Sequence, residues 1–364
     1  MDLLSLRLQS FRSYKSLQLT PPKGVTVIVG ENGTGKTNLL EAIHLCCLGR
    51  SHRTSNDSEL IQYNEETAAV QLVVNRKGGK HDVGVRLYRN QKRKKLLYLN
   101  GKTAPKIGEM MGHATCVMFA PEDLSIVKDG PACRRRFLDM LLSQINRPYF
   151  YALQNYHFAL RQRNALLKTM RFDSDPNLLD VWDEQLSQAG APIIRMRRQT
   201  IQRLNELASS HYAFISGRQE ETLCIAYQGR ISPENEAEKL FRALVETRPE
   251  DIRRQATGVG PHRDDLGIDL AGQDLRAFAS QGQARTAALS LKLAAYDILT
   301  AEQGEPPLLL LDDVLSELDP TRREKLIERI KGAQAFITCT DQSDFLGATP
   351  ACVLRVHNGI IEEA

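Results

Sequence analysis

Residues 30–37 read GENGTGKT, and this glycine-rich octet stands between the apolar run Val25–Val29 and the helical run NLLEAIHLCCL. Glycines at positions 30, 33 and 35 let the backbone curl until successive N–H groups point at one spot, and the positive end of the following helix adds to the field there. The octet matches GxxxxGK[ST] in full, with strand, loop and helix in the required order. A chance glycine-rich turn is the alternative, and the strand and helix on either side disfavour it. The chain is therefore expected to belong to the α/β class and to bind phosphate groups at this loop.

The loop predicts the nucleotide contacts residue by residue. Lys36 is expected to reach the β and γ phosphates, and the Thr37 hydroxyl is expected to bind Mg²⁺, a cation that takes few protein ligands. ATP and Mg²⁺ are thus the predicted cofactors. The predicted nucleotide-binding residues are Gly30, Glu31, Asn32, Gly33, Thr34, Gly35, Lys36, Thr37 and Asn38.

A second motif, PPLLLLDDVLSELD, places four leucines directly before Asp312 and Asp313. This pattern is typical of a buried parallel strand that ends in carboxylates at its carboxyl edge. Asp312 is the predicted Mg²⁺ ligand, direct or through water, and Asp313 is the predicted base that orients or deprotonates the attacking water. With Lys36 they form the predicted catalytic set. The alternative is two acids that cap a turn after a core strand.

Most of the chain separates Lys36 from the acidic pair, so a further unit is predicted between them. The segment Ser280, Gln281, Gly282, Gln283 precedes the helical run TAALSLKLAAYDIL and forms a second phosphate-binding device, made of a hydroxyl, free N–H groups and a helix dipole. One triphosphate does not need two such devices in one chain. The sequence therefore favours a two-fold dimer in which each nucleotide lies between the loop of one protomer and residues 280–283 of the other.

Periodicity predicts a β-rich unit interrupted by a helical one. The expected domains are a discontinuous head, residues 1–130 and 250–364, and an inserted helical or lid domain, residues 131–249, with a short antiparallel helix pair. A new helix is expected at Pro148, a kink at Pro192, and an Asn100-Gly101 hairpin turn. Trp182 is interpreted as core packing between the paired helices. The expected strands are Leu3–Leu8, Val25–Val29, Ala69–Val74, Asp82–Tyr88, Leu96–Leu99, Leu223–Tyr227, Leu266–Leu270 and Leu308–Leu311, with others near Phe336 and Val353.

The longest apolar runs are far shorter than the ~20 residues of a membrane helix, and the amino terminus lacks the unbroken apolar stretch of a signal peptide. Seven cysteines without a CxxC pair favour a reducing, cytoplasmic location over a disulfide framework or zinc site. Charge is nearly balanced overall, yet residues 71–110 hold eleven Lys and Arg against two acids. This local excess suggests an anionic partner, with a solvated hairpin rim as the alternative.

Taken together, the motifs resemble those of ABC-type ATPases: GENGTGKT as Walker A, SQGQ as the signature, LLLLDD as Walker B, and a D-loop with Ser316 and Asp319. Within that class the chain is similar to the RecF family of bacterial recombination mediators, relatives of SMC proteins. The segments that carry this resemblance are LSLRLQSFRSY, GKTNLLEAIHLCCLGRSHRT, MFAPEDLSIVKDGPACRRRFLD, ALRQRNALLK and GVGPHRDDL.

The resemblance implies an ABC-type ATPase head and an ATP-dependent homodimer that binds DNA at gaps and at junctions of duplex and single strand. It implies work with RecR and RecO, indirectly with RecA, in DNA repair, replication restart and the SOS response. Candidate DNA contacts are Lys92, Arg93, Lys94, Lys95 and Arg53. Arg53 is also within plausible reach of the nucleotide.

Two departures from the general ABC pattern predict slow hydrolysis, suited to a switch that releases DNA. Asp313 stands where Glu is usual, and the segment Thr338–Asp341 offers no histidine to the γ phosphate. Pro121-Glu122-Asp123 replaces the usual Q-loop glutamine, so no third metal ligand is assigned. Two rival functions are the ATPase subunit of a membrane transporter and a structural SMC-like protein. The missing histidine disfavours the first, and the short helix pair disfavours the second.

Overall fold

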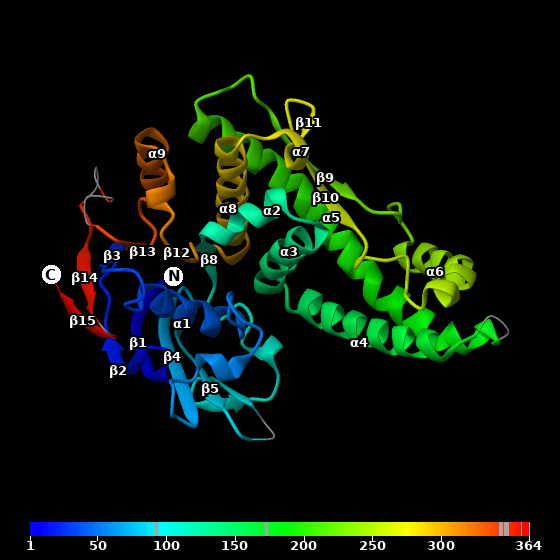
Figure 1. Ribbon diagram of the computed structural model, residues 1–364, viewed down its shortest axis with the longest axis horizontal. Coiled ribbons are helices and arrows are strands. Elements are labelled where there is room, and N and C mark those ends of the chain that lie inside the picture. Colours follow the sequence, from blue (N-terminus) through cyan, green and yellow to red (C-terminus); the bar gives the residue numbers. More distant parts are fainter. Residues whose placement is uncertain (92–93, 172–173, 342–344, 346–348, 358, 364) are drawn as a thin grey trace. The chain divides into compact units, whose positions relative to one another are not determined.

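The computed structural model describes residues 1–364 except 92–93, 172–173, 342–344, 346–348, 358 and 364. The chain divides into two compact units (Figure 1). Unit 1 comprises Met1–Asp123, His211–Arg218 and Ala288–Ala364, and unit 2 comprises Leu124–Ser210 and Gln219–Ala287. Mixed sheets and long helices confirm the predicted α/β class.

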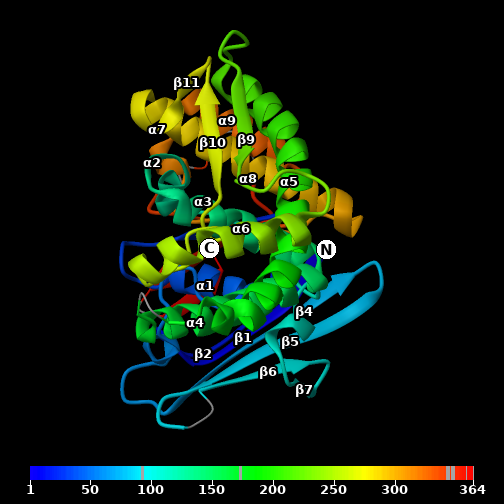
Figure 2. The same cartoon turned by 90° about the vertical axis from the view of Figure 1, so that its right-hand side faces the viewer.

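The first third of the chain forms an antiparallel sheet of six strands in unit 1, in the order β2-β1-β4-β5-β6-β7 (Figure 2). The hairpin between β6 and β7 is confirmed, because Asn100 and Gly101 have φ values of 51° and 74°, as its type I′ turn requires. The strand β2 was not predicted. The bounds are β1 (Asp2–Phe11), β2 (Tyr14–Leu19), β4 (Thr67–Arg76), β5 (Gly79–Tyr88), β6 (Lys95–Leu99) and β7 (Lys102–Ala104).

The second sheet of unit 1 is mixed, in the order β15-β14-β3-β13-β12-β8. Five strands are parallel, and β15 pairs antiparallel with β14 at one edge. Since parallel strands end at the same edge, the segments that follow β3, β13, β12 and β8 meet there. The bounds are β3 (Val25–Val29), β8 (Cys116–Phe119), β12 (Leu308–Leu311), β13 (Ala335–Cys339), β14 (Cys352–His357) and β15 (Ile360–Glu363).

Helix α1 (Lys36–Leu48) contacts strands of both six-stranded sheets, and it is buried on all sides from Leu39 to Leu48. Apolar residues occur on all its sides, as expected for a helix between two layers, and Glu41 and His44 are buried among them. Helices α8 (Gln281–Gln303) and α9 (Pro320–Ile330) lie on the other side of the mixed sheet (Figure 1). Short 3₁₀ turns complete the unit at η1 (Asp57–Leu60), η2 (Ile107–Glu109), η3 (Pro121–Leu124) and η5 (Leu315–Glu317).

Unit 2 contains the predicted helix pair, in which α4 and α5 run in opposite directions (Figure 1). Pro148 lies in the first turn of α4, which Asn146 caps, and Pro192 lies inside an unbroken α5. A three-stranded sheet, β11-β10-β9, completes the unit. The helices are α2 (Ser125–Lys128), α3 (Pro131–Ile145), α4 (Arg147–Thr169), η4 (Pro176–Leu179), α5 (Asp180–Ser216), α6 (Glu236–Arg254) and α7 (Leu275–Phe278). The strands are β9 (Leu223–Gln228), β10 (Asp265–Leu270) and β11 (Gln273–Asp274).

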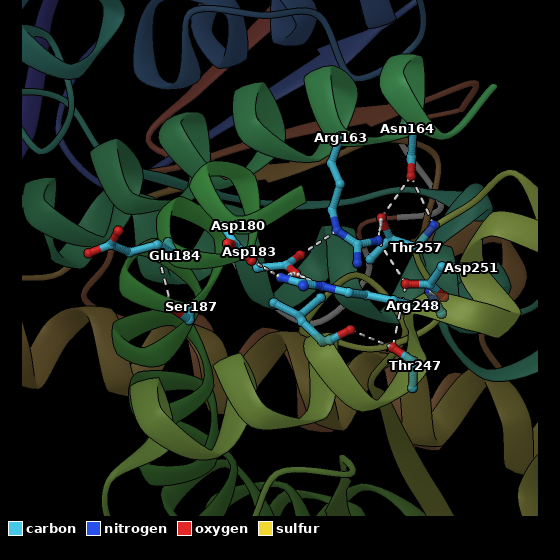
Figure 3. A network of polar contacts seen from close by, with 12 residues as sticks. Arg163, Asn164, Asp180, Asp183, Glu184, Ser187, Thr247, Arg248, Asp251 and Thr257 are labelled. Carbon is cyan, nitrogen blue, oxygen red and sulfur yellow. Dashed lines mark hydrogen bonds and ion pairs between the residues drawn. The ribbon is translucent and has the colours of Figure 1, made fainter. Parts of the chain in front are cut away.

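A buried network of ion pairs joins α4, α5 and α6 (Figure 3). The Arg163 guanidinium, fully buried, donates to Asp183 at 2.6 Å, to Asp251 at 2.7 Å and to the Thr257 hydroxyl at 2.9 Å. Arg248 donates to the second oxygen of Asp183 at 2.8 Å. Buried charges are tolerated only when paired in this way. The network fixes the helix pair and the segment that starts at Thr257.

The division of the chain differs from the predicted domain boundaries. The compact helical unit begins at Leu124 instead of residue 131, and it includes 250–287, which had been assigned to the head. The reason is that β10 pairs with β9 and packs against α3, so this stretch belongs to the sheet of unit 2.

The interpretation of Trp182 needs a correction. Its indole is half-buried and meets the half-exposed ring of Phe158 at 6.4 Å between centroids. The fully buried position beside it is Asp183.

Across the described ranges, no helix is both long enough and apolar enough to span a membrane. All seven cysteines are free thiols, and four of them are buried.

Candidate nucleotide-binding site

Residues 30–37, the phosphate loop, connect the carboxyl end of β3 to α1. Gly35 has a φ of 118°, and a Cβ there would lie 2.6 Å from the Ser13 hydroxyl, so only glycine fits. Gly35 is also the N-cap of α1 and offers no side-chain cap, which leaves the first N–H groups of the helix available to an anion. The loop therefore has the backbone geometry of an anion cradle.

Lys36 lies inside this cradle. Its Nζ donates to the carbonyl of Gly30 at 2.5 Å and to that of Glu31 at 3.2 Å, and the residue is 4% exposed. A cation held inside the loop, next to the N–H groups at the start of α1, gives this site a preference for anions. The turn between β1 and β2 supports the loop from outside, because the Tyr14 hydroxyl donates to the Gly35 carbonyl at 3.0 Å and Asn38 donates to Ser13 at 3.0 Å.

The acidic pair, Asp312 and Asp313, follows β12 at the same edge of the sheet. The Thr37 hydroxyl donates to Asp312 Oδ1 at 2.9 Å, and so joins the phosphate loop to the acidic pair across most of the sequence. Burial raises the pKa of Asp312, and the charges of Asp313 and Glu122 act the same way, while the hydrogen bonds from Thr338 and Thr37 oppose the shift. A hydroxyl and a carboxylate that already touch are the hard oxygen ligands that suit Mg²⁺.

Asp313 has an unusual conformation for a non-glycine residue. Its φ is 50°, in the left-handed region, and its N–H donates to the Thr338 hydroxyl at 2.9 Å. One carboxylate oxygen, Oδ1, is buried and has no hydrogen-bond partner among the described residues. Strained backbone and an unsatisfied buried oxygen at one residue are features that cluster at functional sites.

Thr338, at the end of β13, connects both acids. It donates to Asp312 Oδ1 at 2.8 Å and accepts the N–H of Asp313. The sequence had drawn attention to this position only because it lacks a histidine. The order of strands explains its role, because β13 lies between β3 and β12 and its end faces both.

Asp123, after β8, is held by an ion pair. The buried Lys292 of α8 donates to Asp123 at 2.6 Å and to the Met118 carbonyl at 2.7 Å. This pair fixes the turn that carries Glu122, whose charge acts on Asp312. The buried Lys292 was missed, although a single lysine in the apolar run TAALSLKLAAYDIL was an available signal.

A second buried carboxylate, Glu41, lies one helical turn after the phosphate loop. It accepts two hydrogen bonds from Arg12, both at 2.9 Å, and one from Ser51 at 2.5 Å. Burial would raise the pKa of Glu41, yet the hydrogen bonds from Arg12 and Ser51 and the nearby Arg charges hold it below its ordinary value. Arg53 completes the group, 3.7 Å from Glu41 and 3.2 Å from the Asn38 amide oxygen.

The predicted D-loop residues have local roles in the structure. Ser316 donates to the carbonyl of Asp313 at 2.7 Å, and Asp319 caps α9 by accepting from the N–H of Arg322 at 3.1 Å. Ser316 therefore stabilises the turn that holds the candidate base.

The signature segment, residues 280–283, lies in unit 2 and opens α8. Ser280 Oγ accepts the N–H of Gln283 at 3.2 Å, and the Gln283 side chain accepts the N–H of Ser280 at 3.0 Å. This reciprocal capping box leaves the Ser280 hydroxyl hydrogen and the N–H groups of Gln281 and Gly282 pointing outward from the helix start. Ser280 and Gln281 are exposed.

Comparison with known proteins gives the family. The model described as RecF/RecN/SMC N terminal domain matches residues 2–362. A protein of Symbiobacterium thermophilum named DNA replication and repair protein RecF is 44% identical over 354 residues, covering 95% of this chain and 93% of that protein. The chain belongs to the RecF family. A RecF of Clostridium acetobutylicum is 39% identical, with full coverage of both chains.

Solved structures agree with this assignment. The structure titled recombination mediator protein RecF-ATPrS in RecFOR pathway superposes on this RecF-family chain with a TM-score of 0.91 at 38% identity, covering 100% and 98% of the two chains. The Smc head bound to the C-winged helix domain of ScpA has a TM-score of 0.57 at 18% identity and shares the fold. The fold is therefore the head of the SMC and RecF type of ABC ATPase.

The candidate DNA contacts differ in how exposed their side chains are. Lys92 and Arg93 lie outside the described residues, and Lys94 is exposed between β5 and β6. Lys95 instead donates to the Gly49 carbonyl at 2.9 Å and pairs with Asp57 at 2.8 Å, which gives it an internal role. Arg53 is 43% exposed next to the phosphate loop.

Part of the basic excess in residues 71–110 is also internal. Arg76 pairs with Glu305, and Arg89 holds the backbone of 61–65. The exposed remainder is Lys77, Lys80, Arg86, Lys94, Lys102 and Lys106.

Proposed function

We propose that this RecF-family chain is an ATP-dependent, DNA-binding recombination mediator that dimerises on ATP and releases DNA after slow hydrolysis. The observation that carries the proposal is the Thr37–Asp312 hydrogen bond of 2.9 Å, which joins the phosphate loop to the acidic pair. A relative described as a recombination mediator with bound ATP, at 38% identity over the whole chain, supports the choice of nucleotide.

In this proposal the phosphate loop and Lys36 bind the β and γ phosphates, and the N–H groups at the start of α1 complete the cradle. Thr37 and Asp312 would hold Mg²⁺, which neutralises phosphate charge during transfer. Asp312 is buried, and its Oδ1 accepts hydrogen bonds from both Thr37 and Thr338, so the carboxylate is held in one orientation beside the Thr37 hydroxyl, as a site for a hard cation requires.

Asp313 is the proposed base for the attacking water. Its unpartnered Oδ1 is free to accept a proton or to orient a water. Thr338 holds the backbone of Asp313 and stands where many ABC ATPases have a histidine. An aspartate is one methylene shorter than glutamate, so slow turnover is the expected behaviour, as suits a switch.

The second phosphate device supports dimerisation. Ser280 and the N–H groups of 281–282 are oriented outward by their capping box, and the phosphate loop of the same chain already supplies a full cradle. We infer that the signature segment binds the γ phosphate held by a second protomer, with two-fold symmetry giving two sites. Gapped or junction DNA would then bind a dimer formed only with ATP.

The proposed partners follow from the family. We propose that DNA contacts the exposed basic side chains of residues 77–106 and Arg53, and that RecR and RecO act with the dimer to assist RecA loading. Phosphate contacts from such side chains position DNA without reading sequence.

The test is binding of a duplex with a single-stranded tail at fixed salt, without nucleotide, with ADP and with ATP, with sedimentation measured on the same samples. Tighter binding together with dimers only in ATP is expected, and the affinity should fall with salt in proportion to the phosphates neutralised. Lys36→Met should abolish both effects, whereas the exposed Lys331→Met should leave them intact. Equal affinity and equal mass in all three nucleotide states would refute the proposal.

A further inference from the structure

Phe278 is an exposed aromatic residue two positions before the signature segment. It ends α7 and is 72% exposed, while Leu275, on the same short helix, is buried. Single exposed apolar side chains are common on protein surfaces. The surroundings of Phe278, however, distinguish it from such cases.

The backbone around Phe278 is held on both sides. Asp274 caps the turn by accepting the N–H of Arg276 at 2.8 Å, and Lys128 donates to the Ala279 carbonyl at 2.6 Å. The capping box of Ser280 and Gln283 follows directly. An aromatic ring on a preorganised backbone loses little entropy when a partner covers it, which is the usual property of an interface anchor.

A hollow of about 100 Å³ lies beside the ring. Both apolar and polar residues line it, so ring and hollow together form a projection and a recess on one surface of unit 2. The residues that line it are Glu221, Leu270, Ala271, Gln273, Asp274, Leu275, Phe278, Ala279 and Gln283. The last of these also belongs to the signature segment, so the recess is continuous with the second phosphate device.

This continuity decides what covers the ring. One residue, Ala279, separates Phe278 from Ser280, so their Cα atoms are at most about 7 Å apart. If Ser280 contacts a phosphate that is bound in the phosphate loop of another protomer, the surface around that loop must also come close to Phe278. We propose that Phe278 is the apolar anchor of the ATP-dependent contact between two copies of this chain, packing beside the phosphate loop of the second copy. The proposal rests on the proposed function, because it needs the ATP dimer.

The expected effect is large because each two-fold dimer contains two such rings. Truncation of one anchor ring commonly weakens an interface tenfold or more, so Phe278→Ala should weaken ATP-dependent dimerisation by at least roughly 100-fold. Binding of ATP to the monomer should change by less than about threefold, since Phe278 does not belong to the phosphate loop. Phe278→Tyr keeps the ring and should dimerise like the parent.

The experiment uses the full chain with Asp313→Asn as background, so that ATP persists, and measures the dimer dissociation constant by sedimentation equilibrium. Monomer affinity is measured with a fluorescent ATP analogue at high dilution, and folding by circular dichroism. Phe158→Ala is the matched control, because Phe158 is a half-exposed ring in the same unit.

The outcomes separate the two proposals. A parent that stays monomeric with ATP overturns the proposed function. If the parent dimerises with ATP and the Phe278→Ala variant dimerises with the same affinity, the proposed role of Phe278 is refuted and the proposed function is not. Loss of monomer ATP binding in folded Phe278→Ala, or loss of dimerisation by Phe158→Ala to the same extent, also overturns it.

Discussion

Replacement of Arg163 by methionine tests whether the buried ion-pair network holds unit 2 together. Methionine keeps an unbranched apolar stem, so the change removes the charge and three hydrogen bonds, those to Asp183, Asp251 and Thr257. Asp183 retains Arg248, while Asp251 loses the one arginine that donates to it within the described part of the chain. Removal of one partner from a buried pair costs about 3 to 5 kcal/mol because the other charge stays desolvated.

Trp182 makes this change measurable within unit 2. It is the single tryptophan of the chain and neighbours Asp183 on α5, so its fluorescence follows unfolding of this unit. With a urea dependence of about 2 kcal/mol per M, Arg163→Met should lower the unfolding midpoint by roughly 1.5 to 2.5 M. Lower pH should reduce the difference in urea midpoint between Arg163→Met and the parent, because protonation neutralises the carboxylates that have lost the Arg163 guanidinium.

Arg253→Met is the control, because it makes the same chemical change at an exposed ion pair with Glu250 on α6. Exposed pairs contribute little, so its midpoint should equal that of the parent. A difference in urea midpoint of less than about 0.3 M between Arg163→Met and the parent would lie within the error of the measurement. Such a result would refute the reasoning. The network would then be a consequence of packing and not a cause of it.

Three further predictions concern the nucleotide site and two buried histidines. Thr338→Val keeps the shape of the side chain but removes the donor to Asp312 and the acceptor for the Asp313 N–H. ATP turnover, measured by phosphate release, should fall more than about tenfold. The free energy of unfolding of unit 1, measured by thermal unfolding, should fall by about 1 to 3 kcal/mol. Asp313→Asn should bind ATP and dimerise but not turn over, and rapid phosphate release by this variant would exclude Asp313 as the base. Burial lowers the pKa of both His52 and His262 to about 4, so the unfolded chain binds more protons below pH 6.5. Their contribution to stability is present above pH 6.5 and is lost as pH falls toward 4, and a urea midpoint that rose between pH 7 and pH 5 would contradict this.

The sequence predicts well what is local in the chain. The strand Val25–Val29, the loop and α1 follow from an apolar run, three glycines and a helical pattern, and the strand Leu308–Leu311 before the acidic pair is found with the same bounds. The Asn100-Gly101 turn is equally local. These elements are determined by neighbours in sequence, so periodicity and turn chemistry suffice.

What depends on distant pairing was not predictable. The role of Thr338 follows from the position of β13 between β3 and β12, and no spacing in the sequence encodes that order. Arg163 and Asp183 lie in the interior between α4 and α5, where helical periodicity alone predicts apolar side chains such as Trp182. Helix α6 was not predicted because Pro249 and a high content of charge obscure its pattern. Lys95 was predicted to contact DNA, because its pairing with Asp57 depends on a fold that brings the two residues together.

The position of β3 in the mixed sheet has a consequence for synthesis of the protein. Its two neighbours are β13 and β14, which the ribosome makes about three hundred residues later than β3 itself. The backbone of Gly30 also packs against the carbonyl of Val356, and the N–H of Gly359 donates to Thr34. Strand β3 therefore has no partner on either side until β13 and β14 have been made. A nascent chain that still lacks these two strands would expose both edges of an apolar strand, so nucleotide capture at the phosphate loop should follow their synthesis.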